Sequence, residues 1–167
     1  EKARLEADHV VIASNGYTTE NVFHHHRDRL MPALSNIIVT RPLTEDERAE
    51  QGWTSRVMAY DTRNLLHYFR LLPDGRFLFG GRGGTDASPS AFAERTGWMR
   101  RRLGEKFPAW KDVTIDHAWW GLVCLARDFM PHLGWLDDRR SVLTGMAYHG
   151  SGVSFGTLFG KSAAALL

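Results

Sequence analysis

Cysteine is nearly missing from this sequence. Cys124 is the single thiol among 167 residues, so no intramolecular disulfide can form, and we expect a reducing, cytoplasmic environment. Because Cys124 lies in an apolar run, we predict a buried structural thiol. No apolar stretch approaches the roughly 18 residues of a membrane span, and the first residues form no apolar signal region. These absences argue against a membrane partner.

An excess of charge of either sign is missing too. Lys and Arg number 21 and Asp and Glu number 19, which leaves a formal net charge of +2. Nucleic-acid binders concentrate positive charge on one surface. The densest basic run, residues 100–102, lies in a predicted helix and is interpreted as a solvated face. We therefore expect no nucleic-acid partner.

The chain also lacks an initiator Met and enters an apolar run within nine residues. Residues 9–13 (HVVIA) are continuously apolar and end at the turn residues 14–16. Such a run is typical of a strand buried on both faces of a parallel sheet. A chain that opens so close to a buried strand is expected to open inside a fold, as a fragment of a larger protein.

Short β-rich runs and two capped helices follow. Thr44 and Glu47 form a capping-box pattern at the start of a helix over 45–51. Ser88 and Pro89 begin a longer helix that Pro108 ends. Strands are predicted over these ranges: 36–41, 57–61, 65–71, 76–80, 113–120, 122–126 and 142–145. In the run 65–71, His67 and Phe69 share one face, and Tyr68 and Arg70 share the other.

A glycine-rich segment precedes the last predicted helix, 153–167. The unpaired N–H groups of a helix N-terminus and the helix dipole favour a negative charge or an electron-rich oxygen. Gly152, Gly156 and Gly160 lie on one face of that helix. An interior glycine costs about 0.5–1 kcal/mol relative to Ala. Spacing alone leaves two alternatives open, a ligand beside the stripe or helix-on-sheet packing.

Two other segments carry weaker signals. Residues 80–84 (GGRGG) follow a strand but lack the Lys-Ser/Thr ending of a phosphate-binding loop, so Arg82 is either a polar ligand contact or part of a plain loop. Residues 24–26 are three consecutive His, whose side chains diverge, and no neighbouring pattern completes a tetrahedral site. We predict no metal, and no residue can be named as the catalytic base.

Four segments together resemble the FAD-dependent oxidoreductases of the D-amino-acid oxidase and glycine oxidase superfamily, especially its γ-glutamylputrescine oxidoreductase-like branch. They are residues 7–18, 65–84, 117–134 and 145–160. The third keeps an Asp-x-x-Pro-x-x-Gly pattern as Asp128, Pro131 and Gly134. The resemblance spans nearly the whole chain, and its motifs are specific in combination.

The resemblance implies FAD as cofactor and hydride transfer from an amine carbon to flavin N5. It places seven residues at the cofactor: Gly121, Tyr148, His149, Gly150, Ser151, Gly152 and Val153. Their backbone and the helix end would stabilise negative charge on the reduced ring. Tyr68, Arg70 and Trp120, with Trp119 as an alternative to Trp120, are predicted substrate contacts; sheet packing is the other interpretation of these side chains.

Three departures qualify the resemblance. Val123 stands where amino-acid oxidases of the family place a carboxylate-binding Arg, which favours an amine such as a polyamine derivative. Gly121 stands where sarcosine-oxidase relatives attach flavin through Cys, so FAD is expected to be non-covalent. The dinucleotide-binding GxGxxG fingerprint does not occur here. We therefore expect the isolated chain to bind FAD weakly or not at all and to be inactive.

The predicted fold class is α+β, an antiparallel substrate-domain sheet with helices between pieces of an incomplete FAD-binding α/β domain. Residues 1–34 would end the first part of the FAD domain, 35–118 would form the substrate domain, and 119–167 would return to the FAD domain. The alternative function is a non-catalytic small-molecule or protein binding module built on an antiparallel sheet.

Overall fold

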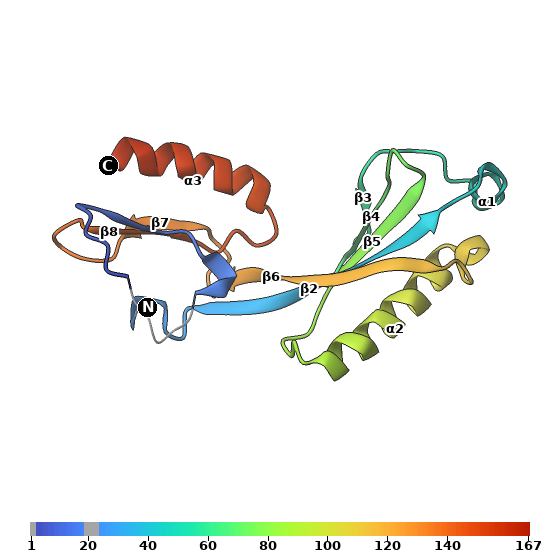
Figure 1. The fold of residues 1–167 in the computed structure, drawn as a ribbon, viewed down its shortest axis with the longest axis horizontal. Helices are drawn as coiled ribbons and strands as arrows, with labels where there is room; N and C mark the ends of the chain where they lie inside the picture. The colour runs from blue at the N-terminus through green and yellow to red at the C-terminus, as the bar shows by residue number, and fades with distance from the viewer. Residues whose placement is uncertain (1–2, 19–23) are drawn as a thin grey trace. The chain divides into compact units, whose positions relative to one another are not determined.

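A computed structural model describes residues 3–18 and 24–167 (Figure 1). The chain forms two compact units: unit 1 comprises Glu1–Ala33 and Leu122–Leu167, and unit 2 comprises Leu34–Gly121. The limits fall inside strands β2 (Leu30–Pro42) and β6 (Ile115–Ala126), near the domain limits expected from the sequence. The FAD-binding and substrate-binding roles of the units stay predictions.

Unit 2 contains a five-stranded sheet in the order β3-β4-β5-β2-β6. Strands β4 (His67–Leu71) and β5 (Arg76–Arg82) form the predicted antiparallel hairpin, with Phe69 opposite Phe79. Strand β3 (Ala59–Tyr60) is shorter than expected and pairs with β4. The mixed α and β content with an antiparallel sheet confirms the predicted fold class.

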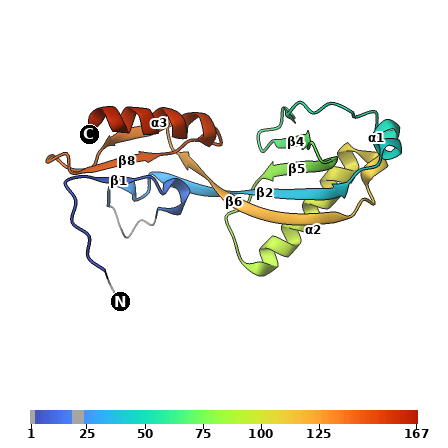
Figure 2. The same cartoon turned by 45° about the horizontal axis from the view of Figure 1, so that its top comes forward.

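One face of this sheet carries the core of unit 2. Helix α2 (Pro89–Lys106) contributes Met99 and Leu103, both fully buried, and packs against β5, crossing the sheet in Figure 2. Phe77 contacts a ring of aromatic neighbours, with centroids 4.6 Å from Trp110 and 4.9 Å from Phe107. A short 3-10 helix, η3 (Pro108–Trp110), follows α2.

The alternation predicted for 65–71 is confirmed. His67, Phe69 and Leu71 are buried on the core face, whereas Arg70 is exposed and Tyr68 is half-buried. The period of two follows from the pleat of a strand with only one covered face. Tyr68 and Arg70 therefore belong to the uncovered face of unit 2.

Both predicted helix starts are also confirmed. Helix α1 (Glu45–Gln51) has the full capping box, with Glu47 N–H donating to Thr44 Oγ1 at 3.1 Å and Thr44 N–H donating to the Glu47 carboxylate at 2.8 Å. Ser88 Oγ accepts from Ala91 N–H at the start of α2, and Pro89 occupies the first helical turn.

Unit 1 contains a three-stranded sheet in the order β1-β8-β7 and helix α3 (Gly152–Leu166). Strand β1 (Val10–Ile12) runs parallel to β8 (Val142–Met146), and β7 (His132–Trp135) runs antiparallel to it. Two 3-10 turns, η1 (Asn15–Tyr17) and η2 (His24–His26), precede β2.

Several expectations for the strands are corrected. Residues 9–13 were expected to be buried on both faces, but Val10 and Val11 are 50% and 46% exposed, because β1 is an edge strand within the described part of the chain. The two runs predicted over 113–120 and 122–126 form one strand, β6, since Gly121 continues the extended backbone. Strand β7 was not predicted. In residues 3–18 and 24–167 no helix combines the length and hydropathy needed to cross a bilayer.

Candidate functional site

The turn between β8 and α3, residues 147–151, has an unusual backbone. Ala147 and His149 have φ angles of 63° and 51°, and Gly150 has a φ of 97°. Non-glycine residues rarely occupy this left-handed region, and each one that does needs support from its surroundings. Ala147 is fully buried. We call residues 147–151 the β8–α3 turn.

Hydrogen bonds from two distant segments hold the β8–α3 turn. Ala147 N–H donates to Asn15 Oδ1 at 2.9 Å. His149 N–H donates to the carbonyl oxygen of Cys124 at 3.2 Å, and Ser151 N–H donates to Tyr148 O at 2.8 Å. The turn is thus fixed by η1 on one side and by β6 on the other.

The η1 segment itself packs tightly against β6. A Cβ at Gly16 would lie 3.0 Å from Leu122 Cβ and 3.6 Å from Cys124 Cβ, so a larger residue would push against β6. Tyr17 Oη accepts from Leu122 N–H at 3.4 Å. Cys124 is 1% exposed, as predicted, and burial raises the pKa of its thiol.

Helix α3 begins directly after this turn with open backbone donors. Among the described residues, the N–H groups of Gly152, Val153 and Ser154 have no acceptor, and Ser151 makes no side-chain cap. Residues 150–154 are exposed. That the backbone of residues 149–153 faces the flavin stays a prediction; within this segment the N–H groups of His149 and Ser151 already bond to carbonyl oxygens. Of the amides from Gly150 to Ser154, those of Gly150 and of the first three residues of α3 bond to no described acceptor.

The glycine stripe of α3 faces open space in this structure. A Cβ at Gly156 or Gly160 would meet no described atom within 4 Å, and at Gly152 it would meet only Tyr148, at 3.8 Å. The helix instead packs through Phe159, whose ring would lie 2.5 Å from a Cβ at Gly145. Of the two alternatives for the stripe, packing on the sheet of unit 1 is therefore excluded for the described chain.

The loop after β6 carries the Asp-x-x-Pro-x-x-Gly pattern and lies beside the β8–α3 turn. The Asp128 carboxylate accepts from Met130 N–H at 3.1 Å and lies 3.1 Å from His132 Nε2, and both contacts lower the pKa of Asp128. Phe129, with a φ of 56°, contacts the His149 ring at a centroid distance of 5.7 Å.

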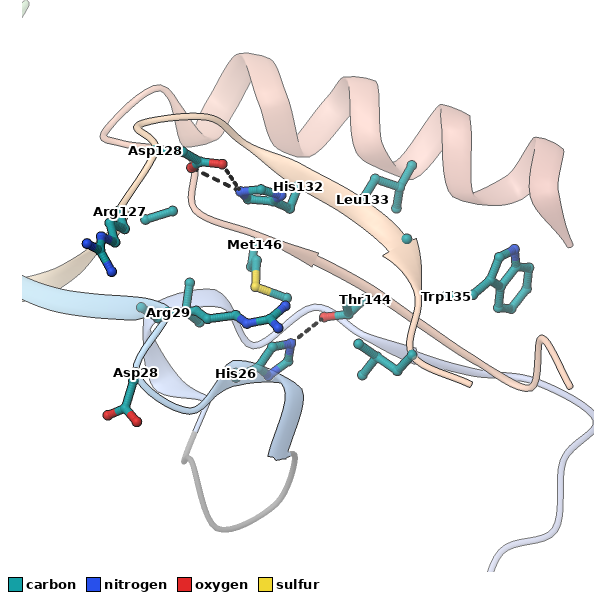
Figure 3. Close-up of a pocket in the computed structure, with 14 residues that line it drawn as sticks. His26, Asp28, Arg29, Arg127, Asp128, His132, Leu133, Trp135, Thr144 and Met146 are labelled. Carbon is teal, nitrogen blue, oxygen red and sulfur yellow. Dashed lines mark hydrogen bonds and ion pairs between the residues drawn. The ribbon is translucent and has the colours of Figure 1, made fainter. Parts of the chain in front are cut away.

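Unit 1 also contains a cavity of about 760 Å³. Gly145 faces α3, so its neighbours Thr144 and Met146 point to the opposite face of the strand, where the cavity lies. Figure 3 shows these side chains with buried His26, whose Nε2 is 3.4 Å from Thr144 Oγ1. The other lining residues are Asp28, Arg29, Leu30, Ala126, Arg127, Asp128, His132, Leu133, Gly134, Trp135 and Leu136.

Sequence reasoning missed this cavity, and none of the predicted cofactor residues lines it. Of the residues that line the cavity, Asp128 and Gly134 stand out in the sequence as members of the Asp-x-x-Pro-x-x-Gly pattern. The run 24–26 supplies His26, while the side chain of His25 lies outside the described part. Among the described residues no three His, Cys, Asp or Glu side chains converge on one point.

The predicted substrate residues belong to unit 2. Tyr68 Oη is 2.8 Å from Ser35 Oγ, and its ring covers Gly80, where a Cβ would lie 2.1 Å from the ring. Burial raises the pKa of Tyr68. Arg70 is exposed on the same face, and Arg82 ends β5 half-buried.

Three further predicted residues lie near the end of unit 2, in β6. Trp119 is 42% exposed, and Trp120 and Gly121 are half-buried. The structure therefore brings Tyr148 to Val153 together in unit 1 and places the substrate candidates and Gly121 in unit 2.

Known proteins resemble this chain in sequence and in fold. The family described as "DAO: FAD dependent oxidoreductase" matches residues 1–166. γ-Glutamylputrescine oxidoreductase from Escherichia coli is 33% identical over 166 residues, which are 99% of this chain and 38% of that protein. A probable oxidoreductase OrdL from Haemophilus influenzae is 27% identical over 96% of this chain and 36% of its own length.

Two crystal structures illustrate the likeness in fold. Iminodiacetate oxidase from Chelativorans superimposes with a TM-score of 0.72 at 18% identity, over 94% of this chain and 41% of that one. Glycine oxidase from Bacillus cereus superimposes with a TM-score of 0.67 at 17% identity, over 95% of this chain and 42% of that one. The chain thus spans about two fifths of the length of these proteins. The matches favour the flavoenzyme interpretation over a binding module, and the chain belongs to the DAO family of FAD-dependent oxidoreductases.

Proposed function

We propose that this chain is part of a flavin-dependent amine oxidoreductase. FAD, when bound, accepts a hydride from the carbon that bears the amine. The observation that carries the proposal is the open N-terminus of α3, where three unpaired amides follow a turn held in a strained conformation. The names of the similar proteins support an amine, since γ-glutamylputrescine, iminodiacetate and glycine all contain an amino group.

The first three amides of α3 fit the electron-rich edge of a flavin ring. Gly152, Val153 and Ser154 offer N–H donors at the positive end of a 15-residue helix. Such donors stabilise negative charge most when they are fixed before the charge develops. The hydrogen bonds of Ala147 and His149 supply that rigidity. The donors and their supports favour this turn as the proposed flavin site.

We propose non-covalent attachment of the flavin. The position that carries an attaching Cys in sarcosine-oxidase relatives is Gly121 here. The one thiol of the sequence, Cys124, is 1% exposed with a raised pKa, so it is neither accessible nor reactive enough for a flavin bond.

For the substrate side we propose Tyr68, Arg70 and Trp120. The Tyr68 ring is held over Gly80 by its bond to Ser35, which gives a rigid apolar surface with one polar end. Arg70 adds an exposed positive charge on the same sheet face. Val123 provides no cation for an α-carboxylate, so an amine such as a polyamine derivative is the proposed substrate class.

The experiment is anaerobic mixing of the complete flavoprotein that carries this chain with γ-glutamylputrescine, putrescine, iminodiacetate and glycine in parallel. Loss of the flavin absorbance with a polyamine derivative is expected, and acid precipitation should release the flavin. A protein without flavin, or a flavin that none of the four amines reduces, contradicts the proposal. Tight FAD binding by the 167-residue chain alone would contradict the expectation that further cofactor contacts lie outside it.

A further inference from the structure

The hydrogen bond between Asn15 and Ala147 joins residues 132 positions apart and is the side-chain contact that fixes the start of the β8–α3 turn. Ala147 is 0% exposed, and besides Asn15 Oδ1 the group close to its N–H is the Cys124 sulfur, a weak acceptor. A buried donor left without an acceptor is costly. Loss of this hydrogen bond should therefore favour other conformations of the β8–α3 turn.

Asn suits this position for two separate reasons. Its φ is 45°, in the left-handed region that Asn enters more readily than most other non-glycine residues. Its amide oxygen supplies the acceptor for Ala147. The backbone carbonyl of Asn15 also accepts from Thr18 N–H at 3.1 Å, which closes η1. Backbone conformation and acceptor can therefore be tested separately.

The position of Asn15 depends in turn on β6. Gly16 packs against Leu122 and Cys124. The carbonyl oxygen of Cys124 in turn accepts a hydrogen bond from His149 N–H in the β8–α3 turn. Asn15 and Cys124 thus hold the turn at its first and third residues. The first three amides of α3 follow within seven residues of Ala147, so their direction depends on this two-point support.

We infer that Asn15 is a positioning residue for the flavin: its side chain holds the β8–α3 turn so that the first amides of α3 point at the cofactor. The inference rests on the proposed function. Asn15 does not itself touch the cofactor; it acts through Ala147.

The test compares two substitutions in the complete flavoprotein. Asn15→Gly keeps a residue that accepts a positive φ but removes the acceptor, whereas Asn15→Asp keeps an acceptor oxygen. We expect Asn15→Gly to weaken FAD binding about tenfold or more and to shift the flavin midpoint potential to a more negative value. Asn15→Asp should retain FAD affinity within about threefold. Asn64→Gly, in an exposed loop of unit 2, is the matched control and should change neither quantity.

Hydrogen exchange supplies a readout that does not depend on activity. In Asn15→Gly the Ala147 amide should exchange faster by about tenfold or more, while core amides of unit 2 such as that of Phe79 stay protected. An unchanged FAD affinity and flavin midpoint potential in Asn15→Gly would overturn the inference. An equal loss of FAD affinity in Asn15→Gly and Asn15→Asp would overturn it too. If the wild-type protein holds no FAD, the proposed function fails instead, which separates the two outcomes.

Discussion

His67 Nδ1 donates to the carboxylate of Asp61 at 2.9 Å inside the core of unit 2, with the imidazole 1% exposed. Lys106 Nζ lies 3.2 Å from the same carboxylate. The His67 ring stacks on Phe79 at a centroid distance of 5.0 Å. A charged carboxylate is thus held at the edge of an aromatic core by two partners.

This pair predicts how stability depends on pH. Burial lowers the pKa of His67, and Asp61 offsets this in part. Burial alone would raise the pKa of Asp61, but the hydrogen bonds from His67 and Lys106 outweigh it and lower that pKa to about 2. Both folded pKa values lie below the unfolded ones, so stability is fully present above pH 6.5, the ordinary His value, and falls as pH decreases. Asp61 adds a second loss between its ordinary value of 3.8 and about 2.

Urea denaturation of the chain from pH 8 to pH 2 measures this dependence. Asp61→Asn should reduce the acidic step and destabilise the chain by about 1–2 kcal/mol at neutral pH; the remainder of the step comes from groups such as Glu47, whose pKa the hydrogen bond with Arg41 lowers to about 2. Asp138→Asn, at a position away from this core, is the control. An unchanged acidic step in Asp61→Asn would show that other carboxylates cause it.

Phe77→Ala should be among the most damaging single changes in unit 2. The side chain is 0% exposed and contacts Trp53, Phe69, Phe107 and Trp110. Truncation leaves a cavity lined by rigid rings, for which about 3–5 kcal/mol is expected. Tyr60→Ala, at a side chain that is 72% exposed, should cost less than about 0.5 kcal/mol. Denaturant midpoints of the two variants provide the comparison.

Gly156→Ala should have opposite effects in two contexts. In the chain alone, the new Cβ meets no described atom within 4 Å, so α3 should gain about 0.5–1 kcal/mol. In the complete flavoprotein, a methyl group on this face should weaken FAD binding or lower the melting temperature if a ligand or a second backbone lies there. Melting curves of the wild-type and Gly156→Ala proteins, recorded for the isolated chain and for the complete flavoprotein, test this. A gain of stability in both would leave the glycine stripe without a structural role.

Cys124 should react slowly with an aromatic disulfide reagent. Its side chain is buried in β6, and burial raises its pKa, so thiolate at the surface is scarce. We expect labelling of the folded chain to be more than about 100-fold slower than that of the urea-unfolded chain. Fast labelling of the folded chain would mean that β6 opens locally.

The parts of this fold that follow from local chemistry were predictable. The capping box of Thr44 and Glu47, the Ser88-Pro89 helix start and the alternation around Phe69 each depend on residues within a few positions. Local patterns of this kind specify helix starts and strand faces directly. Local patterns also predicted the antiparallel hairpin of β4 and β5.

The remainder depends on contacts between distant residues. The exposure of Val10 and Val11 is decided by which strands flank β1, and the sequence of β1 does not contain that information. Strand β7 forms because His132 to Trp135 pair with β8. The cavity forms where His26, Asp128 and Thr144, from three distant parts of the chain, line one space. Which amides of the β8–α3 turn are free depends on Asn15 and Cys124, so spacing within 145–160 could not distinguish them.

The edge position of β1 has a practical consequence for handling this polypeptide. An unpaired strand edge with apolar side chains on it is a template for pairing with another molecule. A solution of the 167-residue chain should therefore self-associate as its concentration rises, and light scattering should detect this before any change in helix content. A charged replacement such as Val10→Lys should reduce this association, because Val10 and Val11 place exposed apolar side chains on the strand edge.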